Sequence, residues 1–263
     1  PDMDKALVSI RNEIADLDGL PYPDYGLVRY AKLTPRLTHY PIGRTRGCGF
    51  NCEFCSVKGG VHSASAQHLF QTVNWLVETR GARKFFIVDD RLEEDMAGTI
   101  EFFRLVKEKY GNELSFLVQM RLESAKNAEF VNAMVEAGVR TVCIGYESPI
   151  DEDLKAMRKG ITSANMLEWT QILGRHFWIH AMCIFGYPPK DGQNQMAAKE
   201  MAMRFKVFIR KANRLARRGF SIQILKAVPA IGTDLYRRLD KDGVLFPLSL
   251  LPWRYYDGNW ACF

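Results

Sequence analysis

A regular alternation of β-rich and helical stretches is the feature that most limits how this chain can fold. The expected strands are His39–Arg46, Lys84–Asp89, Leu114–Met120, Arg140–Gly145, Trp178–Phe185 and Phe220–Leu225. The expected helices are Ser65–Arg80, Asp95–Tyr110, Asn127–Ala137, Ile150–Met157 with Ser163–Arg175, Gln195–Arg218, and one that starts near Asp234. Strands that alternate with helices favour a parallel sheet with right-handed crossovers. Because six such units are too few to close an eight-stranded barrel, we predict an α/β fold, an open, TIM-like partial (βα)6 barrel.

The chain divides into three predicted parts. Residues 1–38 form a lead-in or linker segment, 39–240 the partial barrel, and 241–263 a C-terminal extension. The chain starts at Pro1 and ends without a polar tail, so we expect a trimmed piece of a longer protein. No apolar run approaches the roughly 18–20 residues of a membrane span, and no signal peptide is visible, which favours a cytoplasmic location.

Three of the six cysteines lie within eight residues, as Cys48, Cys52 and Cys55. Their C-x3-C-x2-C spacing follows the first expected strand, and Gly47 and Gly49 allow the backbone to turn closely around a metal centre. Three thiolates satisfy three irons of a cubane, which normally takes four cysteines, so one iron is left open for an exogenous ligand. Two alternatives stay open: a zinc site with His62 as fourth ligand, and inert buried thiols.

The triplet, with Phe54 just before its last cysteine, resembles the signature of the radical S-adenosylmethionine superfamily. The resemblance extends from about Tyr40 to Tyr236, and the family fold is a partial six-unit barrel. It implies that a [4Fe–4S] cluster binds to Cys48, Cys52 and Cys55. It also implies that S-adenosylmethionine chelates the open iron and is cleaved reductively to a 5′-deoxyadenosyl radical, which activates a C–H bond.

The resemblance also implies a cofactor pocket at the carboxyl ends of the strands. The candidate S-adenosylmethionine contacts are Phe54, Asp89, Asp90, Gln119, Arg121, Gly145, Glu147, Ser148, Arg158, Lys159 and Gly186. Among them, Asp89 or Asp90 is expected at the methionine ammonium, Glu147 at the ribose, and a cation at the carboxylate. No residue identifies a general acid or base.

Several of these residues have structural alternatives. Asp89 or Asp90 is also a suitable helix N-cap, and Arg158 and Lys159 suit a solvated helix end. Cys143 and Cys183 are predicted to be core thiols. The net charge of +6 gathers in the amphipathic helix Arg204–Arg218, for which we favour packing on the barrel with an outer face in solvent or against a missing domain. Nucleic-acid or membrane binding by this helix is the alternative.

Within the superfamily, three segments most resemble members that carry a cobalamin-binding domain before the barrel. They are Asp18-Gly-Leu-Pro-Tyr-Pro-Asp24, the Asp89–Asp90 pair and Gly145-Tyr-Glu-Ser-Pro149. The histidine loop of that domain, D-x-H-x-x-G, is absent from this sequence. Such members methylate unactivated carbon or phosphorus, or rearrange carbon skeletons.

The resemblance implies a transferase, a methyltransferase rather than an oxidoreductase or lyase. Its expected partners are a small-molecule or lipid substrate and a reductase, ferredoxin or flavodoxin as electron donor, with nucleic acid not expected. A methylthiotransferase acting on RNA or protein is one alternative, although its second three-cysteine cluster is absent from this sequence. A non-enzymatic zinc-binding module is the other.

Overall fold

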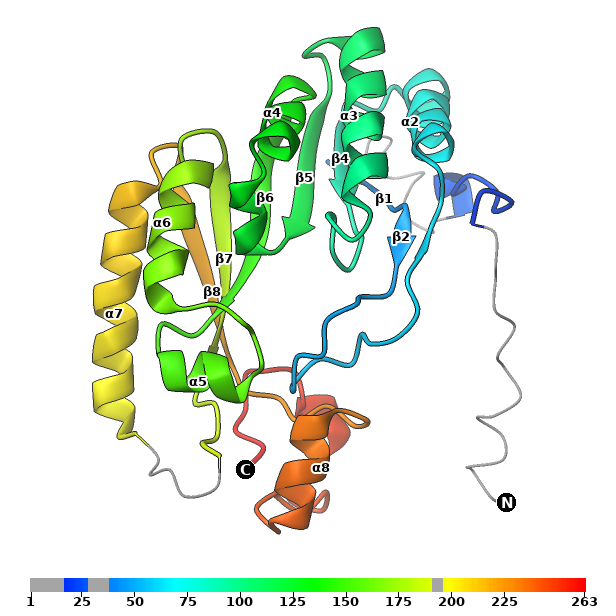
Figure 1. The fold of residues 1–263 in the computed structure, drawn as a ribbon. Coiled ribbons are helices and arrows are strands. Elements are labelled where there is room, and N and C mark those ends of the chain that lie inside the picture. Colours follow the sequence, from blue (N-terminus) through cyan, green and yellow to red (C-terminus); the bar gives the residue numbers. More distant parts are fainter. Residues whose placement is uncertain (1–16, 28–37, 191–195) are drawn as a thin grey trace, which may run out of the picture.

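A computed structural model describes residues 17–27, 38–190 and 196–263 of the chain. Within these ranges six parallel strands form one sheet in the order β1-β4-β5-β6-β7-β8. The strands are β1 (Tyr40–Ile42), β4 (Lys84–Ile87), β5 (Ser115–Met120), β6 (Val139–Glu147), β7 (Trp178–Phe185) and β8 (Phe220–Lys226). The sheet curves without closing, which confirms the predicted partial barrel (Figure 1).

The helices that connect the strands lie along the outer side of the curved sheet (Figure 1). They are α2 (Ala66–Arg80), α3 (Met96–Tyr110), α4 (Ala128–Glu136), α6 (Ser163–Leu173) and α7 (Ala198–Leu215), while the short α5 (Asp151–Ala156) lies at the end of the sheet where β6 finishes (Figure 1). Ser65, Asp95 and Asn127 cap α2, α3 and α4 by accepting a hydrogen bond from a backbone N–H of the first turn. Their side chains explain why these helices begin where the sequence predicts.

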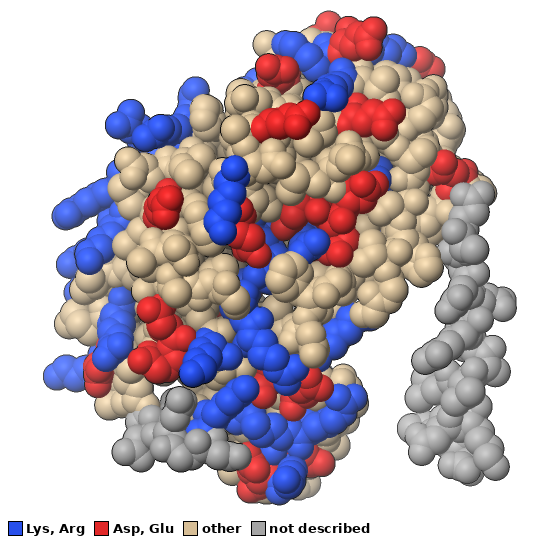
Figure 2. Space-filling model, in the orientation of Figure 1, with Lys and Arg blue, Asp and Glu red and all other residues tan. Residues whose placement is uncertain are grey.

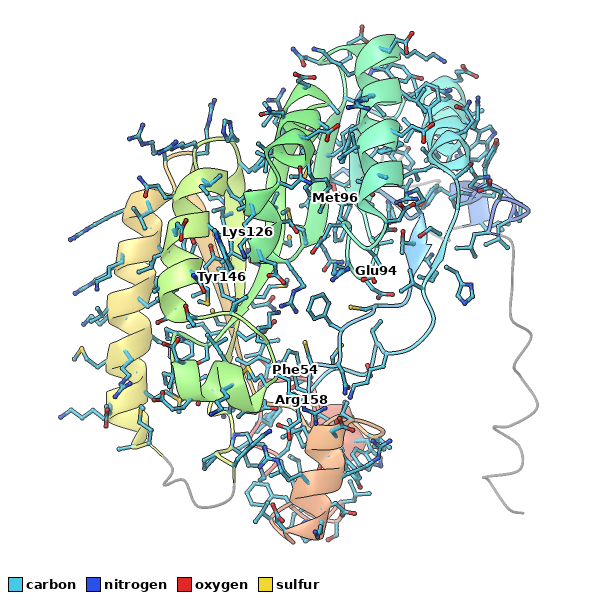
Figure 3. All side chains as sticks on the ribbon, viewed as in Figure 1. Phe54, Glu94, Met96, Lys126, Tyr146 and Arg158 are labelled. Carbon is cyan, nitrogen blue, oxygen red and sulfur yellow. The ribbon has the colours of Figure 1, made fainter. Side chains whose placement is uncertain are left out.

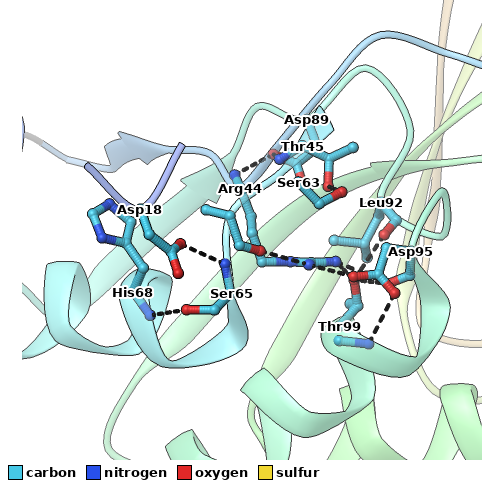
Figure 4. A network of polar contacts seen from close by, with 12 residues as sticks. Asp18, Arg44, Thr45, Ser63, Ser65, His68, Asp89, Leu92, Asp95 and Thr99 are labelled. Atoms are coloured by element: carbon cyan, nitrogen blue, oxygen red, sulfur yellow. Dashed lines mark hydrogen bonds and ion pairs between the residues drawn. The ribbon is translucent and has the colours of Figure 1, made fainter. Parts of the chain in front are cut away.

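The first strand differs from its prediction. The run His39–Arg46 is divided: β1 joins the main sheet, while β2 (Thr45–Arg46) pairs antiparallel with β3 (His62–Ser63). Where β2 begins, the backbone N–H groups of Arg44 and Thr45 donate to the buried carboxylate of Asp89, at 2.6 and 3.0 Å (Figure 4). This side chain takes hydrogen bonds that a continuous strand would give to its neighbour, so the chain turns away from the sheet there.

An aromatic cluster fills the core between the sheet and the outer helices. Phe116 of β5 stacks on Phe85 of β4, with ring centroids 5.4 Å apart, and meets the rings of Phe102 and Phe103 of α3 edge-on. All four side chains are at most 1% exposed. This packing fixes α3 against the middle of the sheet and, with it, the segment that follows β4.

Segments at both ends of the barrel pack against it. In the lead-in, the carboxylate of Asp18 accepts from the N–H of Ser65 at 2.6 Å, and the hydroxyl of Tyr25 donates to the carbonyl of Pro41. After β8 come α8 (Asp234–Lys241) and η4 (Trp253–Tyr255), and the N–H of Lys226 donates to the carbonyl of Gly258 at 2.7 Å. The three-part division of the chain stays a prediction, and most of the lead-in lies outside the described residues.

None of the helices in the described part of the chain combines the length and the apolar character that a membrane span requires.

The aromatic cluster supplies a test of the fold. Phe116→Ala removes a fully buried ring, and we expect the free energy of unfolding to fall by about 3–5 kcal/mol, measured by chemical denaturation. Phe246 is 43% exposed and is the matched control. Phe246→Ala is expected to cost under about 1 kcal/mol. Equal losses in the two variants would contradict this packing.

Candidate functional site

The three clustered cysteines lie in the long loop between β2 and β3, on the side of the sheet where its strands end. Cys48, Cys52 and Cys55 together line a cavity of about 180 Å³. Gly47 has φ +88°, and a Cβ at this position would lie 2.2 Å from the carbonyl oxygen of Gly60. Only glycine therefore lets the two arms of the loop approach so closely.

Acidic side chains hold the first half of this loop. The N–H of Gly47 donates to Asp90 at 3.0 Å, and the N–H of Gly49 donates to Glu94 at 3.1 Å. Both carboxylates come from the segment between β4 and α3. They bind backbone on each side of Cys48 and so fix where its thiol lies.

The second half of the loop is held by a buried acid, Glu53, between the second and third cysteines. Its side chain is 4% exposed, pairs with Arg238 of α8 at 3.0 Å and accepts from the hydroxyl of Tyr187 at 2.6 Å. Its own backbone N–H donates to the carbonyl of Met157, and its carbonyl accepts from the N–H of Leu235. Burial and the bond to Glu53 raise the pKa of Tyr187 well above its ordinary value. Glu53 is thus a positioning residue that sequence reasoning missed.

The two halves of the loop face different parts of the structure. Glu94 lies on the side toward β4, while Phe54 lies on the side toward α8, where it packs with Tyr187 and Leu235 (Figure 3).

The end of β6 forms a charged wall of the cavity. Glu147 has φ +60°, a left-handed conformation that is rare for a residue with a side chain, and it follows a break in the register between β6 and β7. Its carboxylate pairs with the ammonium of Lys159 at 2.8 Å, and both side chains are at most 10% exposed. Strain of this kind persists only where the surroundings over-determine it, and it concentrates at functional sites.

Gly145 gives this wall its shape. A Cβ there would lie 2.3 Å from a carboxylate oxygen of Glu147 and 3.0 Å from the Lys159 nitrogen. Because Glu147 folds back over Gly145, the carboxylate and the ammonium both reach the cavity.

Arg121 joins the charged wall to the cysteines. Its guanidinium lies 3.9 Å from the centre of the Phe50 ring, donates to the carbonyl of Lys159 at 2.5 Å and lies 3.8 Å from the sulfur of Cys52. It also pairs with Glu123. Burial raises the pKa of the Cys55 thiol, and the nearby Lys159 opposes that rise. Burial thus outweighs Lys159, and the net effect of the site on the Cys55 thiol is a raised pKa.

The structure brings together most of the candidate residues, but not all. Those that line the cavity with the cysteines are Phe54, Asp90, Gln119, Arg121, Gly145, Glu147 and Lys159. Asp89 instead binds the backbone of Arg44 and Thr45, and its pKa is raised by burial. The predicted N-cap role also falls to neither Asp89 nor Asp90, because Asp95 caps α3.

Three other candidates lie outside the cavity lining. Ser148 donates to Asp153 at 2.6 Å, Arg158 pairs with Asp234 at 2.8 Å, and Gly186 lines a separate pocket beside Cys262. Arg158 also has a left-handed backbone, with φ +57°, at the turn that presents Lys159. Its contacts here are with α8, on the far side of that turn.

The cavity also contains residues that the sequence analysis missed. They are Phe50, Arg91, Met120, Cys143 and Met182. The prediction that Cys143 is a core thiol was wrong, because it is half-buried and faces the cavity. Side chains alternate along a strand, so Cys143 shares a face with Gly145, and this spacing was the available signal. Cys183 is buried in the core as predicted, and burial raises its pKa to about 12.

The donor set fits a cluster carried by three cysteines. Across the described ranges, no three His, Cys, Asp or Glu side chains converge closely enough to hold one metal ion. A cubane does not require such convergence, because each cysteine binds a different iron. His62, the proposed fourth zinc ligand, is exposed in β3 and does not line the cavity.

Comparison with known protein families assigns the chain to a superfamily. The model of the radical SAM superfamily matches residues 42–203, which include the cysteine loop and β4 to β7. The chain therefore belongs to the radical SAM superfamily. A domain of this superfamily is expected to bind a [4Fe–4S] cluster and S-adenosylmethionine.

Curated relatives of the chain are named as methyltransferases. An uncharacterized methyltransferase of Pyrococcus horikoshii is 25% identical over 259 residues, 94% of this chain and 52% of the relative. A hopanoid C-2 methylase of Rhodopseudomonas palustris is 24% identical over 151 residues, 55% of this chain and 28% of the relative. The chain thus spans about half the length of the Pyrococcus horikoshii relative and a smaller share of the other curated relatives that it matches.

Solved structures share the fold at low sequence identity. The cobalamin-dependent S-adenosylmethionine radical enzyme OxsB, with aqua-cobalamin and S-adenosylmethionine bound, has a TM-score of 0.65 and 14% identity, covering 92% of this chain and 41% of that one. The radical S-adenosylmethionine methyltransferase TsrM of Kitasatospora setae has a TM-score of 0.60 and 16% identity, covering 78% and 39%. At these identities the likeness concerns the fold alone.

The anchoring role of Glu53 is testable. Glu53→Gln leaves the partly buried Arg238 without its charged partner, and we expect the free energy of unfolding to fall by about 1–3 kcal/mol. Iron retained after reconstitution and desalting should fall with it. The matched control is Glu78→Gln, which removes an exposed carboxylate 3.8 Å from Lys109 and should cost under about 1 kcal/mol. Unchanged iron retention in Glu53→Gln would show that the loop does not depend on this pair.

Proposed function

We propose that this chain is the catalytic core of a radical S-adenosylmethionine methyltransferase that acts on a small molecule or lipid with the help of cobalamin. The observation that carries the radical chemistry is the set of three thiols around one cavity that also contains Glu147, Lys159 and Arg121. The methyltransferase class is supported by curated relatives that are named as methyltransferases, and cobalamin by similar structures of cobalamin-bound enzymes.

The residues of the cavity take distinct roles in this proposal. Cys48, Cys52 and Cys55 hold the cluster, and their number leaves one iron for the amine and carboxylate of S-adenosylmethionine. The chemistry supplied there by a bound [4Fe–4S] cluster is one-electron cleavage of the sulfonium, which gives methionine and a 5′-deoxyadenosyl radical for C–H activation. Phe50 and Phe54 keep water from the cavity.

The charged wall orients the rest of S-adenosylmethionine. Glu147 accepts from the ribose hydroxyls, and Lys159 holds its carboxylate in that position at 2.8 Å. Arg121 offers a guanidinium to the methionine carboxylate, and Asp90 offers a carboxylate to the ammonium. Gly145 leaves room for the nucleoside beside β6. Electrons come from a ferredoxin, flavodoxin or reductase.

The first test of the radical mechanism removes a cysteine. The protein is purified without oxygen, reconstituted with iron and sulfide, and reduced. We expect about four irons per chain, an electron paramagnetic resonance signal that shifts with S-adenosylmethionine, and 5′-deoxyadenosine by chromatography. Cys52→Ala should lose the signal and the product, while Cys183→Ala, a buried cysteine outside the cavity lining, should retain both. Stoichiometric zinc without iron would overturn the proposal in favour of a zinc-binding module.

The proposed ribose contact has its own test. Glu147→Gln removes a charge-assisted hydrogen bond, so we expect S-adenosylmethionine to bind about tenfold to a hundredfold more weakly with iron content unchanged. The titrated shift of the cluster signal measures this affinity. Glu101→Gln, an exposed residue on α3, is the matched control and should bind normally. A normal affinity in Glu147→Gln would remove Glu147 from the binding site.

Cobalamin dependence is tested on the full-length protein. We expect it to bind cobalamin and to transfer a methyl group only when cobalamin is present. A full-length protein that binds no corrinoid and still methylates its substrate would remove this part of the proposal.

A further inference from the structure

The basic charge of the protein is concentrated on one helix. Residues 198–218 contain eight Lys or Arg and a single Glu, a net charge of +7, whereas the whole chain carries +6. All other residues together therefore carry a net charge of −1. The excess belongs to α7 and the turn after it, not to the surface in general, which indicates a local use for it.

The outer face of α7 is free to meet a partner. Its inner face packs on the barrel through Met201, Phe205, Phe208 and Ala212, which confirms the predicted packing. The outward cations are exposed: Lys199, Arg204, Lys206, Arg210, Lys211 and Arg214, followed by Arg217 and Arg218. In the part of the chain that the structure describes, α7 makes a single ion pair, between Arg204 and Glu200. Lys and Arg crowd the edge of the molecule where Figure 1 draws α7 (Figure 2).

Aliphatic side chains lie among these cations. Met203 and Val207 are 55% and 44% exposed and stand one helical turn apart, on the same side as Lys206 and Arg210. Both aromatic residues of the helix, Phe205 and Phe208, are buried. A surface for single-stranded nucleic acid would use exposed aromatic rings for stacking. Cations mixed with exposed aliphatic groups suit the headgroup region of a lipid bilayer, where phosphates meet acyl chains.

We propose that the outer face of α7 and of the turn after it, defined by Lys199, Met203, Lys206, Val207, Arg210, Arg214 and Arg217, docks the protein on an anionic lipid bilayer. The cations pair with lipid phosphates, and Met203 and Val207 enter the boundary of the acyl chains. Because α7 covers the outer side of the sheet, docking leaves the cysteine cavity on the other side uncovered (Figure 1). The proposal concerns binding only and does not depend on the radical chemistry.

Vesicle sedimentation tests the docking surface. The probes are vesicles of phosphatidylcholine alone and of phosphatidylcholine mixed with phosphatidylglycerol. We expect binding to the mixed vesicles only, weakened by added salt. Replacing four outward cations by Gln (Lys206, Arg210, Arg214 and Arg217) should weaken binding about a hundredfold or more, since each cation contributes a severalfold factor.

A matched control removes the same charge elsewhere. Four exposed cations on β4, α3, β6 and the turn before β4 are replaced by Gln: Arg83, Lys84, Lys107 and Arg140. This variant has the same net charge as the α7 variant and should bind within about threefold of the wild type. Circular dichroism verifies that both variants are folded. Equal weakening in the two would overturn the proposal, because the attraction would then be non-local.

Two further variants test whether the bound partner is lipid and whether its binding is independent of the proposed radical chemistry. Met203→Ser with Val207→Ser should weaken vesicle binding about tenfold while keeping all charges. Cys52→Ala should bind vesicles normally, so vesicle binding can be interpreted even if the proposed cluster chemistry is wrong. No binding to mixed vesicles would overturn the proposal. Binding of a single-stranded RNA that is tighter than vesicle binding and insensitive to Met203→Ser with Val207→Ser would overturn it as well.

Discussion

The site depends on a loop with almost no regular structure being held still, and carboxylates, of which Glu53 is buried, do this. Asp90 and Glu94 bind backbone on one side of the loop, while Glu53 on the loop itself pairs with Arg238 and Tyr187 on the other. Each of these acids accepts hydrogen bonds from groups distant in the sequence. A charge-assisted hydrogen bond is stronger than a neutral one, so a few such contacts can hold a flexible segment where hydrophobic packing is sparse.

Charged contacts also hold the opposite wall of the cavity. Glu147, Lys159 and Arg121 come from two strand ends and a turn, and they form a connected set through 2.8 and 2.5 Å contacts. Opposite charges that satisfy one another tolerate burial far better than single ones. The left-handed backbone at Glu147 and Arg158 is the local strain that accompanies this arrangement.

The sequence was most informative where a pattern repeats. The alternation of strands and helices predicted the parallel sheet, and the capping residues Ser65, Asp95 and Asn127 marked where helices begin. It was least informative where long-range contacts decide. Nothing local separates Asp89, which ends up binding the backbone of Arg44 and Thr45, from Asp90, which faces the cavity. Glu53 reads as an ordinary loop residue, because its partners lie 134 and 185 residues away.

The ladder of β2 and β3 is only two residue pairs long, Thr45 with Ser63 and Arg46 with His62. It closes the base of the cysteine loop and is separate from the six-stranded sheet. Opening the loop breaks this short ladder and the carboxylate contacts that hold the loop, and it leaves the aromatic core under α3 untouched. Assembly of an iron–sulfur centre can therefore proceed as a local closing of the loop on a barrel that is already folded. Damage to such a centre by oxygen would likewise release one loop for repair, with no need to refold the chain.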